Sequence, residues 1–395
     1  METTKISADK QKIINAVDAR DVELRKLSLK IHANPELNFE EFKAAKWLSD
    51  YLEQEGFSVE RGVAGLETAF VATWTGTPGG PTIGILAEYD ALPRIGHACG
   101  HNIIGTSAVG AGIALKDAYP HLKGTIKVIG TPAEEGGGGK IIMADKGIFD
   151  DLDAAMMTHP SSRTMVLRGG IACVPATFKF YGKEAHAAGS PELGISALDA
   201  LMNSFMAINS LREYFPDDVR VHGIVTHGGD AANIVPGYAE AEYVIRAATM
   251  KKLEGIKERV YNAVRSSAAA VGAKCEIIEG LTYAERNNNV PLAKLYQNNL
   301  ESIGVEVFEP PKDGGLGSSD IGNVGQIVPT IHPYIRIGDA AGHTLQFTEA
   351  SKSEAGMRGQ NQATKAMAMT AYDLCTNKQA LQNVKDAFAA WKQKN

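Results

Sequence analysis

The sequence predicts an α/β protein of two domains, in which a smaller domain interrupts a larger one. Short apolar runs alternate with helical segments through the first part of the chain, a different order of elements follows Gly170, and the first pattern returns near the C-terminus. The length points the same way, because 395 residues are more than one hydrophobic core usually holds.

In the larger domain, apolar residues at helical spacing predict long helices, and apolar runs bounded by Gly and Pro predict buried strands. Their alternation favours a sheet covered by helices on both faces. The expected elements are helices at 8–32 and 39–55, strands at 68–74 and 82–87, a helix at 103–118, a strand at 125–129, a helix at 140–146 and a strand at 154–158, and then, beyond the smaller domain, a helix at 292–303, a strand at 330–337 and a long helix from 348.

The smaller domain has the order βαββαβ, which is that of a ferredoxin-like unit. We place the larger domain at residues 1–173 and 286–395 and the smaller one at 174–285. The expected elements are strands at 176–181, 219–226, 238–247 and 274–279, with helices at 194–211 and 253–270.

Composition excludes several classes of protein. A net charge of −6 without a basic stripe argues against a nucleic-acid partner or an anionic membrane surface. No apolar run approaches the roughly 18 residues needed to span a bilayer. The four cysteines are scattered rather than spaced as a disulfide framework, so we expect a cytoplasmic protein. They are Cys99, Cys173, Cys275 and Cys375.

The segment His97-Ala98-Cys99-Gly100-His101 is the strongest chemical signal in the sequence. In extended backbone Cys99 and His101 would point the same way, and thiolate and imidazole both bind zinc well. The alternative is a core cysteine between histidines that have other partners. Position favours a site, because the segment follows the strand at 82–87 and the acidic residues Glu88 and Asp90.

Glu134 and Glu135 follow the strand at 125–129 and precede four glycines. One carboxylate could bind a metal while the other acts as general base on a metal-bound water. The alternative is that Glu134 and Glu135 are a solvated pair of charged residues in a loop. A phosphate-binding loop is excluded, because Glu134 and Ile141 stand where it needs Gly and Ser or Thr.

Two further histidines follow predicted strands of the same sheet, His159 after 154–158 and His343 after 330–337. Alone, each is more often a surface or core residue than a ligand. In the smaller domain His186 lies between a strand and a helix, Asn233 precedes a strand, and Arg246 closes that strand. Arg246 is either a solvated charge or a clamp for a substrate carboxylate.

Together these motifs resemble the metallo-aminoacylase and carboxypeptidase family of co-catalytic metallopeptidases, and most of all its branch of amino-acid-conjugate hydrolases and p-aminobenzoyl-glutamate hydrolase. The resemblance extends over nearly the whole chain in the same order. It rests on Ile31-His32-Ala33-Asn34-Pro35-Glu36-Leu37, Leu86-Ala87-Glu88-Tyr89-Asp90-Ala91-Leu92-Pro93, Gly96-His97-Ala98-Cys99-Gly100-His101-Asn102, Pro132-Ala133-Glu134-Glu135-Gly136-Gly137, Thr158-His159-Pro160, Ala185-His186-Ala187-Ala188 and Gly317-Ser318-Ser319-Asp320.

The resemblance implies a zinc-peptidase-like α/β catalytic domain with an inserted lid that forms a homodimer. It implies two divalent ions per chain, Zn²⁺ or Mn²⁺, with the Cys99 thiolate bridging them. Glu134 would be the general base and acid, and Asp90 would orient a ligand. His186 would stabilise the oxyanion, in its own chain or across the dimer, while Asn233 and Arg246 would hold the substrate's polar end. The implied ligands are Cys99, His101, Glu135, His159 and His343.

Two positions depart from the family pattern, because Glu88 and Asn102 stand where many relatives have Asp. Neither is a ligand in this interpretation. They favour the p-aminobenzoyl-glutamate and dipeptide-hydrolase side of the family. The expected reaction is hydrolysis of the amide of an N-acyl amino acid or related conjugate. The alternatives are a metallo-dipeptidase or carboxypeptidase, and a non-catalytic metal-binding protein.

Overall fold

The computed structural model describes residues 6–311 and 316–394, which fold into two units. Unit 1 comprises Met1–Gly169, Arg286–Gly315 and Ser319–Asn395. Unit 2 comprises Gly170–Glu285 and Leu316–Ser318. None of the helices within the described residues is both long and apolar enough to cross a membrane.

Unit 1 is built on a mixed six-stranded sheet. Its order is β1 (Ser58–Arg61), β2 (Phe70–Thr75), β4 (Lys123–Gly130), β3 (Thr77–Ala87), β5 (Ala154–Met156) and β11 (Thr330–Ile331). The last four of these strands are parallel to one another, and β2 is antiparallel to both of its neighbours, β1 and β4. The parallel strands therefore end at one edge of the sheet.

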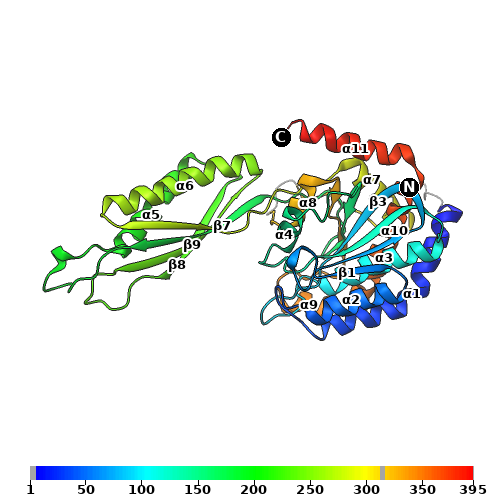
Figure 1. Cartoon of the computed structure of the whole chain (residues 1–395), viewed down its shortest axis with the longest axis horizontal. Coiled ribbons are helices and arrows are strands. Elements are labelled where there is room, and N and C mark those ends of the chain that lie inside the picture. The colour runs from blue at the N-terminus through cyan, green and yellow to red at the C-terminus, as the bar shows by residue number, and fades with distance from the viewer. Residues whose placement is uncertain (1–5, 312–315, 395) are drawn as a thin grey trace. The chain divides into compact units, whose positions relative to one another are not determined.

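Helices cover both faces of this sheet, as the alternating pattern predicts (Figure 1). Alternate side chains of β3 enter different cores, with Ile83 and Ile85 on one face and Leu86 on the other. The first core includes residues of α1 (Ala8–His32), α2 (Phe42–Gln54), α3 (His101–Ala118), α7 (Val290–Ser302) and α10 (Glu354–Thr376), and the second includes residues of α4 (Gly139–Asp145) and α8 (Ile321–Ile327).

Several elements differ from the expectation, for example β1, which was not expected, and β3, which begins at Thr77. The helix expected at 39–55 begins at Phe42, because Phe39 is left-handed with φ +62°. The strand expected at 330–337 is divided near Pro333, and its second part, β12 (Tyr334–Arg336), pairs with β6 (His159–Ser161) in a separate sheet. The helix expected from 348 is three helices, α9 (Leu345–Ala350), α10 and α11 (Lys378–Lys392).

Unit 2 is the ferredoxin-like fold that its order of elements predicts. Its antiparallel sheet has the order β10-β7-β9-β8, and α5 and α6 lie along one face (Figure 1). The ends of the unit are hydrogen-bonded to each other, since the backbones of Cys173 and Tyr283 exchange two bonds of 2.9 Å. The elements are β7 (Ala172–Tyr181), α5 (Ala197–Leu211), β8 (Arg220–His227), β9 (Tyr238–Ala247), α6 (Met250–Ala270) and β10 (Lys274–Glu279).

Candidate metal centre

Polar side chains gather where the parallel strands of unit 1 end. Glu88 and Asp90 follow β3, Glu134 and Glu135 follow β4, and His159 follows β5. Because these strands run parallel, their carboxyl ends lie at the same edge, where ligands of open α/β sheets usually bind. The topology therefore brings five chemically capable residues to one place.

The segment from His97 to His101 is a turn that leads into α3. Gly100 has a φ of +74°, and the helix begins at the next residue. The expected extended conformation is therefore wrong, because a left-handed residue interrupts it. A side chain at Gly100 would also place its Cβ 2.8 Å from Cγ of Pro160. The turn nevertheless directs Cys99 and His101 to the same point.

Cys99, His101 and Glu135 form a first cluster of potential ligands, with one atom of each within 4.8 Å of the others. His101 Nε2 lies 3.8 Å from Glu135 Oε1, and neither buried atom has a hydrogen-bond partner in the described part of the chain. Buried polar atoms normally have a partner, and zinc accepts these three ligand types. The cluster therefore fits a divalent cation.

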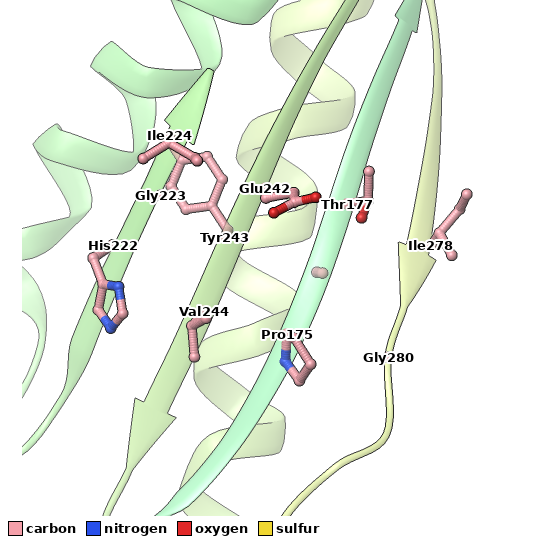
Figure 2. A pocket seen from close by; sticks show the side chains of 11 residues that line it. Pro175, Thr177, His222, Gly223, Ile224, Glu242, Tyr243, Val244, Ile278 and Gly280 are labelled. Atoms are coloured by element: carbon pink, nitrogen blue, oxygen red, sulfur yellow. The ribbon is translucent and has the colours of Figure 1, made fainter. Parts of the chain in front are cut away.

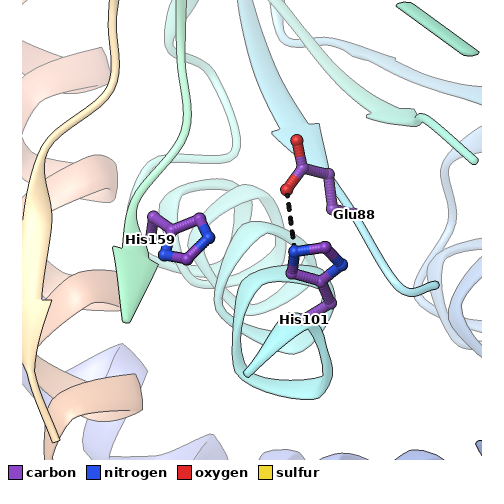
Figure 3. A group of neighbouring side chains, drawn as sticks. All are labelled: Glu88, His101 and His159. Atoms are coloured by element: carbon purple, nitrogen blue, oxygen red, sulfur yellow. Dashed lines mark ion pairs between the residues drawn. The ribbon is translucent and has the colours of Figure 1, made fainter. Parts of the chain in front are cut away.

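A second cluster consists of Glu88, His101 and His159 (Figure 3). His101 Nε2 is 3.6 Å from Glu88 Oε2. His159 Nδ1 lies 2.7 Å from the carbonyl oxygen of Pro160, to which it donates as Nδ1–H, and this leaves the lone pair of Nε2 free for a metal. Glu88, which the sequence interpretation left out of the ligand set, thus lies beside two candidate ligands.

Asp90 contacts two members of the first cluster, His101 and Glu135. Its Oδ1 is 2.9 Å from His101 Nδ1, and its Oδ2 accepts a hydrogen bond of 2.9 Å from the backbone N–H of Glu135. The bond to Nδ1 leaves Nε2 of His101 directed to the cluster. Asp90 therefore links the side chain of one candidate ligand to the backbone of another.

The surroundings shift the pKa values of the candidate ligands in opposite directions. Burial lowers the pKa of His101, but nearby carboxylates, above all Asp90, outweigh it and raise this pKa well above its usual value. Burial, with the charge of His101, lowers the pKa of His159 to about 3. Burial and the carboxylate of Glu135 raise the pKa of the Cys99 thiol far above its usual range. Metal binding here would release protons from His101 and Cys99.

His343 reaches the cluster from the loop before α9. Its Nε2 is 3.8 Å from Glu135 Oε2, and its backbone N–H donates a bond of 3.0 Å to the carbonyl of Ala98. The residue is left-handed, with φ +63°, and its side chain is 65% exposed. All five predicted ligands therefore lie in or beside the two clusters, with His343 on the solvent side.

A third group contains Glu134, Glu88 and Asp320, whose carboxylate oxygens also lie within 4.8 Å of one another. The buried ammonium of Lys140 forms ion pairs with Glu88 and Asp320. Sequence reasoning did not assign Lys140 or Asp320 to the site. The sequence feature that could have identified them is their position in the motifs. Lys140 directly follows the glycine run, and Asp320 ends the motif Gly317-Ser318-Ser319-Asp320.

The glycines after Glu135 allow close packing. A Cβ at Gly139 would lie 1.9 Å from the carbonyl oxygen of Pro132, and one at Gly137 would lie 2.5 Å from Cβ of Ala133. Only glycine lets the start of α4 lie this close to the segment that contains Glu134.

His332 is a further residue that sequence reasoning missed, although it directly follows β11 at the same edge. Its ring lies 5.3 Å from that of His159. Nη1 of Arg286 donates a 2.8 Å hydrogen bond to His332 Nδ1, so the proton of the neutral ring is on Nε2. That Nε2 is buried without a partner among the described residues.

In unit 2 the structure brings His186 and Asn233 together but leaves Arg246 apart. The backbone N–H of Ala187, next to His186, donates a 3.0 Å hydrogen bond to the carbonyl of Asn233. The side chains of His186 and Asn233 are both exposed. Arg246 lies near the other end of β9, where Nη1 donates to Ser318 Oγ at 3.0 Å. Asn233 precedes β9, and from Tyr238, where this strand begins, to Arg246 it spans roughly 27 Å at about 3.4 Å per residue.

The uncovered face of the unit 2 sheet has a groove of about 650 Å³ (Figure 2). Apolar side chains such as Pro175 and Val244 line it together with the carboxylate of Glu242. Arg246 belongs to the same face as Val244, because alternate residues of β9 point the same way.

Comparison with known proteins agrees with the motifs. The profile of peptidase family M20/M25/M40 matches residues 84–357. The Xaa-Arg dipeptidase of Mus musculus is 37% identical over 395 residues, covering 96% of this chain and 92% of the mouse protein. One of the subunits of the p-aminobenzoyl-glutamate hydrolase of Escherichia coli K12 is 37% identical over 284 residues, covering 67% of this chain and 56% of that protein.

Solved structures show the same fold. A putative aminohydrolase from methicillin-resistant Staphylococcus aureus superposes with a TM-score of 0.77 at 19% identity, covering 93% of this chain and all (100%) of that one. A dinuclear metal binding peptidase of Bacillus subtilis gives a TM-score of 0.68 at 20% identity, covering 90% of this chain and 99% of that one.

Proposed function

The chain belongs to peptidase family M20/M25/M40 and is a metallo-hydrolase, and we propose that it is a dipeptidase. Of the reaction classes expected from the sequence, the comparisons favour this alternative over hydrolysis of N-acyl amino acids. The observation that supports it most is the 37% identity with an Xaa-Arg dipeptidase over 96% of the chain. The proposed substrates are dipeptides that end in arginine.

Cys99, His101, Glu135, His159 and His343 would hold two divalent ions, Zn²⁺ or Mn²⁺. The two clusters share His101. Buried atoms of His101, Glu88 and Glu135 that have no hydrogen-bond partner among the described residues support this assignment. Glu88 lies close enough to His101 and His159 to be a further candidate. Bound ions would supply a water that ionises near neutral pH and would polarise the scissile carbonyl.

Glu134 would act as general base and acid. It lies in the segment after β4 and keeps some access to solvent, while its neighbour Glu135 faces His101. It would take a proton from the attacking water and return it to the departing nitrogen. Asp90 would hold His101 and the Glu135 backbone in place during these steps.

In unit 2, His186 would stabilise the oxyanion, while Asn233 and Arg246 would bind polar groups of the substrate. Since Asn233 and Arg246 lie toward opposite ends of β9, we propose that they serve different substrate molecules, with His186 and Asn233 acting on the substrate of a partner chain. This assignment goes with the proposed homodimer through unit 2. The proposed location of the protein is the cytoplasm.

A substrate panel tests the proposed reaction. The full chain is stripped of metal, reloaded with Mn²⁺ or Zn²⁺, and assayed on Xaa-Arg dipeptides, N-acetyl amino acids and p-aminobenzoyl-glutamate. We expect kcat/KM to be at least about tenfold higher for the dipeptides, since a site built to bind a polar group discriminates strongly. Preference for the acyl amino acids would overturn the dipeptidase assignment, and the absence of any turnover would favour a non-catalytic metal-binding protein.

A further inference from the structure

Lys140 is a completely buried lysine with two carboxylate partners. Its Nζ lies 2.8 Å from Asp320 Oδ1 and forms a second ion pair with Glu88 Oε1. The backbone N–H of Lys140 also donates a 2.9 Å hydrogen bond to Asp320 Oδ2. All three side chains have 0% exposure. Lysine is almost never fully buried unless it is paired, and here two ion pairs meet that condition.

The glycine run places this lysine. Gly138 is left-handed, with φ +63°, and starts α4 so that Lys140 lies in its first turn. The packing of Gly139 on the carbonyl of Pro132 then sets the helix close to the segment that follows β4. Asp320 comes from the start of α8 and Glu88 from the end of β3, so Lys140 joins three elements at the edge that holds the candidate metal centre.

The ammonium lies among three carboxylates. Oxygens of Glu88, Glu134 and Asp320 are within 4.8 Å of one another, and two of these residues are ion-paired with Lys140. Like charges at such distances repel strongly in a buried environment. Glu88 also links the two sites, since its Oε1 pairs with Lys140 while its Oε2 is 3.6 Å from His101 Nε2.

We propose that Lys140 is a positioning residue, whose ammonium fixes Glu88 and Asp320 and thereby keeps Glu134 aligned for proton transfer. It does not touch the substrate. The ammonium fills the place of a cation among these three carboxylates, so this group is not a further metal site. The proposal rests on the proposed function, because it takes Glu134 as the general base.

The test is the variant Lys140→Met, which keeps an unbranched side chain and removes the charge. Without the ammonium, repulsion displaces Glu134, and a misplacement of about 1 Å costs about 100-fold in turnover. We expect kcat to fall by about this factor with KM changed little. The Mn²⁺ dissociation constant, measured by competition with a chelator, should stay the same or fall, because a positive charge near the metal site is lost.

The double variant Lys140→Met/Asp320→Asn removes one carboxylate together with the ammonium. If Lys140 acts by balancing charge, this variant recovers at least about tenfold in kcat over Lys140→Met. A purely structural role predicts instead that the two losses add and that Mn²⁺ binding weakens. Additive losses, weaker Mn²⁺ binding or unchanged kcat in Lys140→Met would each overturn the proposal. If Lys140→Met does not fold, the double variant alone is compared with the wild type. A kcat of the double variant more than about 100-fold below that of the wild type then overturns the proposal.

Lys127→Met is the matched control, because the ion pair that Lys127 on β4 forms within residues 6–311 and 316–394 is with Asp151, whose side chain is 60% exposed. Its kcat and Mn²⁺ affinity should equal those of the wild type. Glu134→Gln distinguishes a wrong role for Lys140 from a wrong general base. If that variant is inactive while Lys140→Met is normal, only the role of Lys140 is wrong. If Glu134→Gln is fully active, the proposed mechanism fails first.

Discussion

Nδ1 of His101 lies 2.9 Å from Oδ1 of Asp90, and both side chains are buried. The second oxygen of Asp90 accepts a hydrogen bond from the backbone of Glu135. One carboxylate thus fixes the ring of one candidate ligand and the main chain of another. The orienting role that the resemblance implies for Asp90 stays a prediction, and a variant tests it.

Asp90→Asn should weaken metal binding about 10–100-fold, the usual loss when a residue that orients a ligand is changed. An amide can still contact Nδ1 but no longer provides a negative charge. Competition with a chelator for Mn²⁺ measures the change. Asp151→Asn, at an exposed position, is the control. Equal affinities in the two variants would contradict this role.

Glu134→Gln should keep its metal and lose most of its turnover. A positioned acid and base contributes about 10²–10⁴-fold to the rate, and glutamine cannot accept the proton. Metal content by elemental analysis and kcat on a dipeptide give the two readouts. Activity close to the wild-type level would rule out this residue as the base.

Glu41 connects the loop before α2 to the segment that follows β4. Its carboxylate accepts hydrogen bonds from the backbone N–H groups of Phe39 and Ala133, at 3.0 and 2.9 Å, and from Thr68 Oγ1 at 3.0 Å. Phe39 and Ala133 are both left-handed, with φ of +62° and +57°. Burial, with the charge of Asp90, raises the pKa of Glu41 to about 7.

A raised carboxyl pKa means that the folded chain binds a proton more tightly than the unfolded chain, whose pKa is about 4.3. This contribution is complete below about pH 4 and is lost as the pH rises to about 7. Relative to Glu41→Gln, the wild type should therefore lose about 3 kcal/mol of unfolding free energy across this range. Urea denaturation at several pH values measures it. Glu40→Gln, at an exposed position, should show no such divergence, and parallel curves for Glu41→Gln would disprove the shift.

Gly139→Ala should destabilise the protein by about 1–3 kcal/mol, the usual effect of overpacking. The new Cβ would lie 1.9 Å from the carbonyl oxygen of Pro132, which is backbone and cannot move aside cheaply. Gly255→Ala is the opposite control, because nothing lies within 4 Å of its Cβ position in α6. It should stabilise the protein by roughly 0.5–1 kcal/mol. Thermal unfolding with opposite changes in Tm would support both assignments.

Sequence reasoning succeeded where local pattern decides the structure. The helix Ala8–His32 was predicted to the residue, because Ser7 caps it and its apolar spacing is regular. The order of elements in unit 2 identified the ferredoxin-like fold for the same reason. It failed where a single backbone angle decides, as at Gly100, whose left-handed φ turns the expected extended segment into a helix start.

Pairings between distant elements were also hidden from the sequence. Lys140 and Asp320 are 180 positions apart, and the sequence around neither residue predicts their ion pair. The exclusion of Glu88 from the ligand set relied on comparison with the family pattern. The structure places it beside His101 and His159, a closeness that only the assembled sheet reveals.

The hydrogen bonds between Cys173 and Tyr283 have a consequence for how unit 1 is connected. Because unit 2 begins and ends at neighbouring points, the elements of unit 1 before and after it, β6 and α7, are joined as if by a short connection. The entropy of closing that connection then depends on the few residues at its two ends and hardly on the length of the insertion. Such an arrangement lets each unit acquire sequence changes, or even be exchanged, with little effect on the chain path of the other.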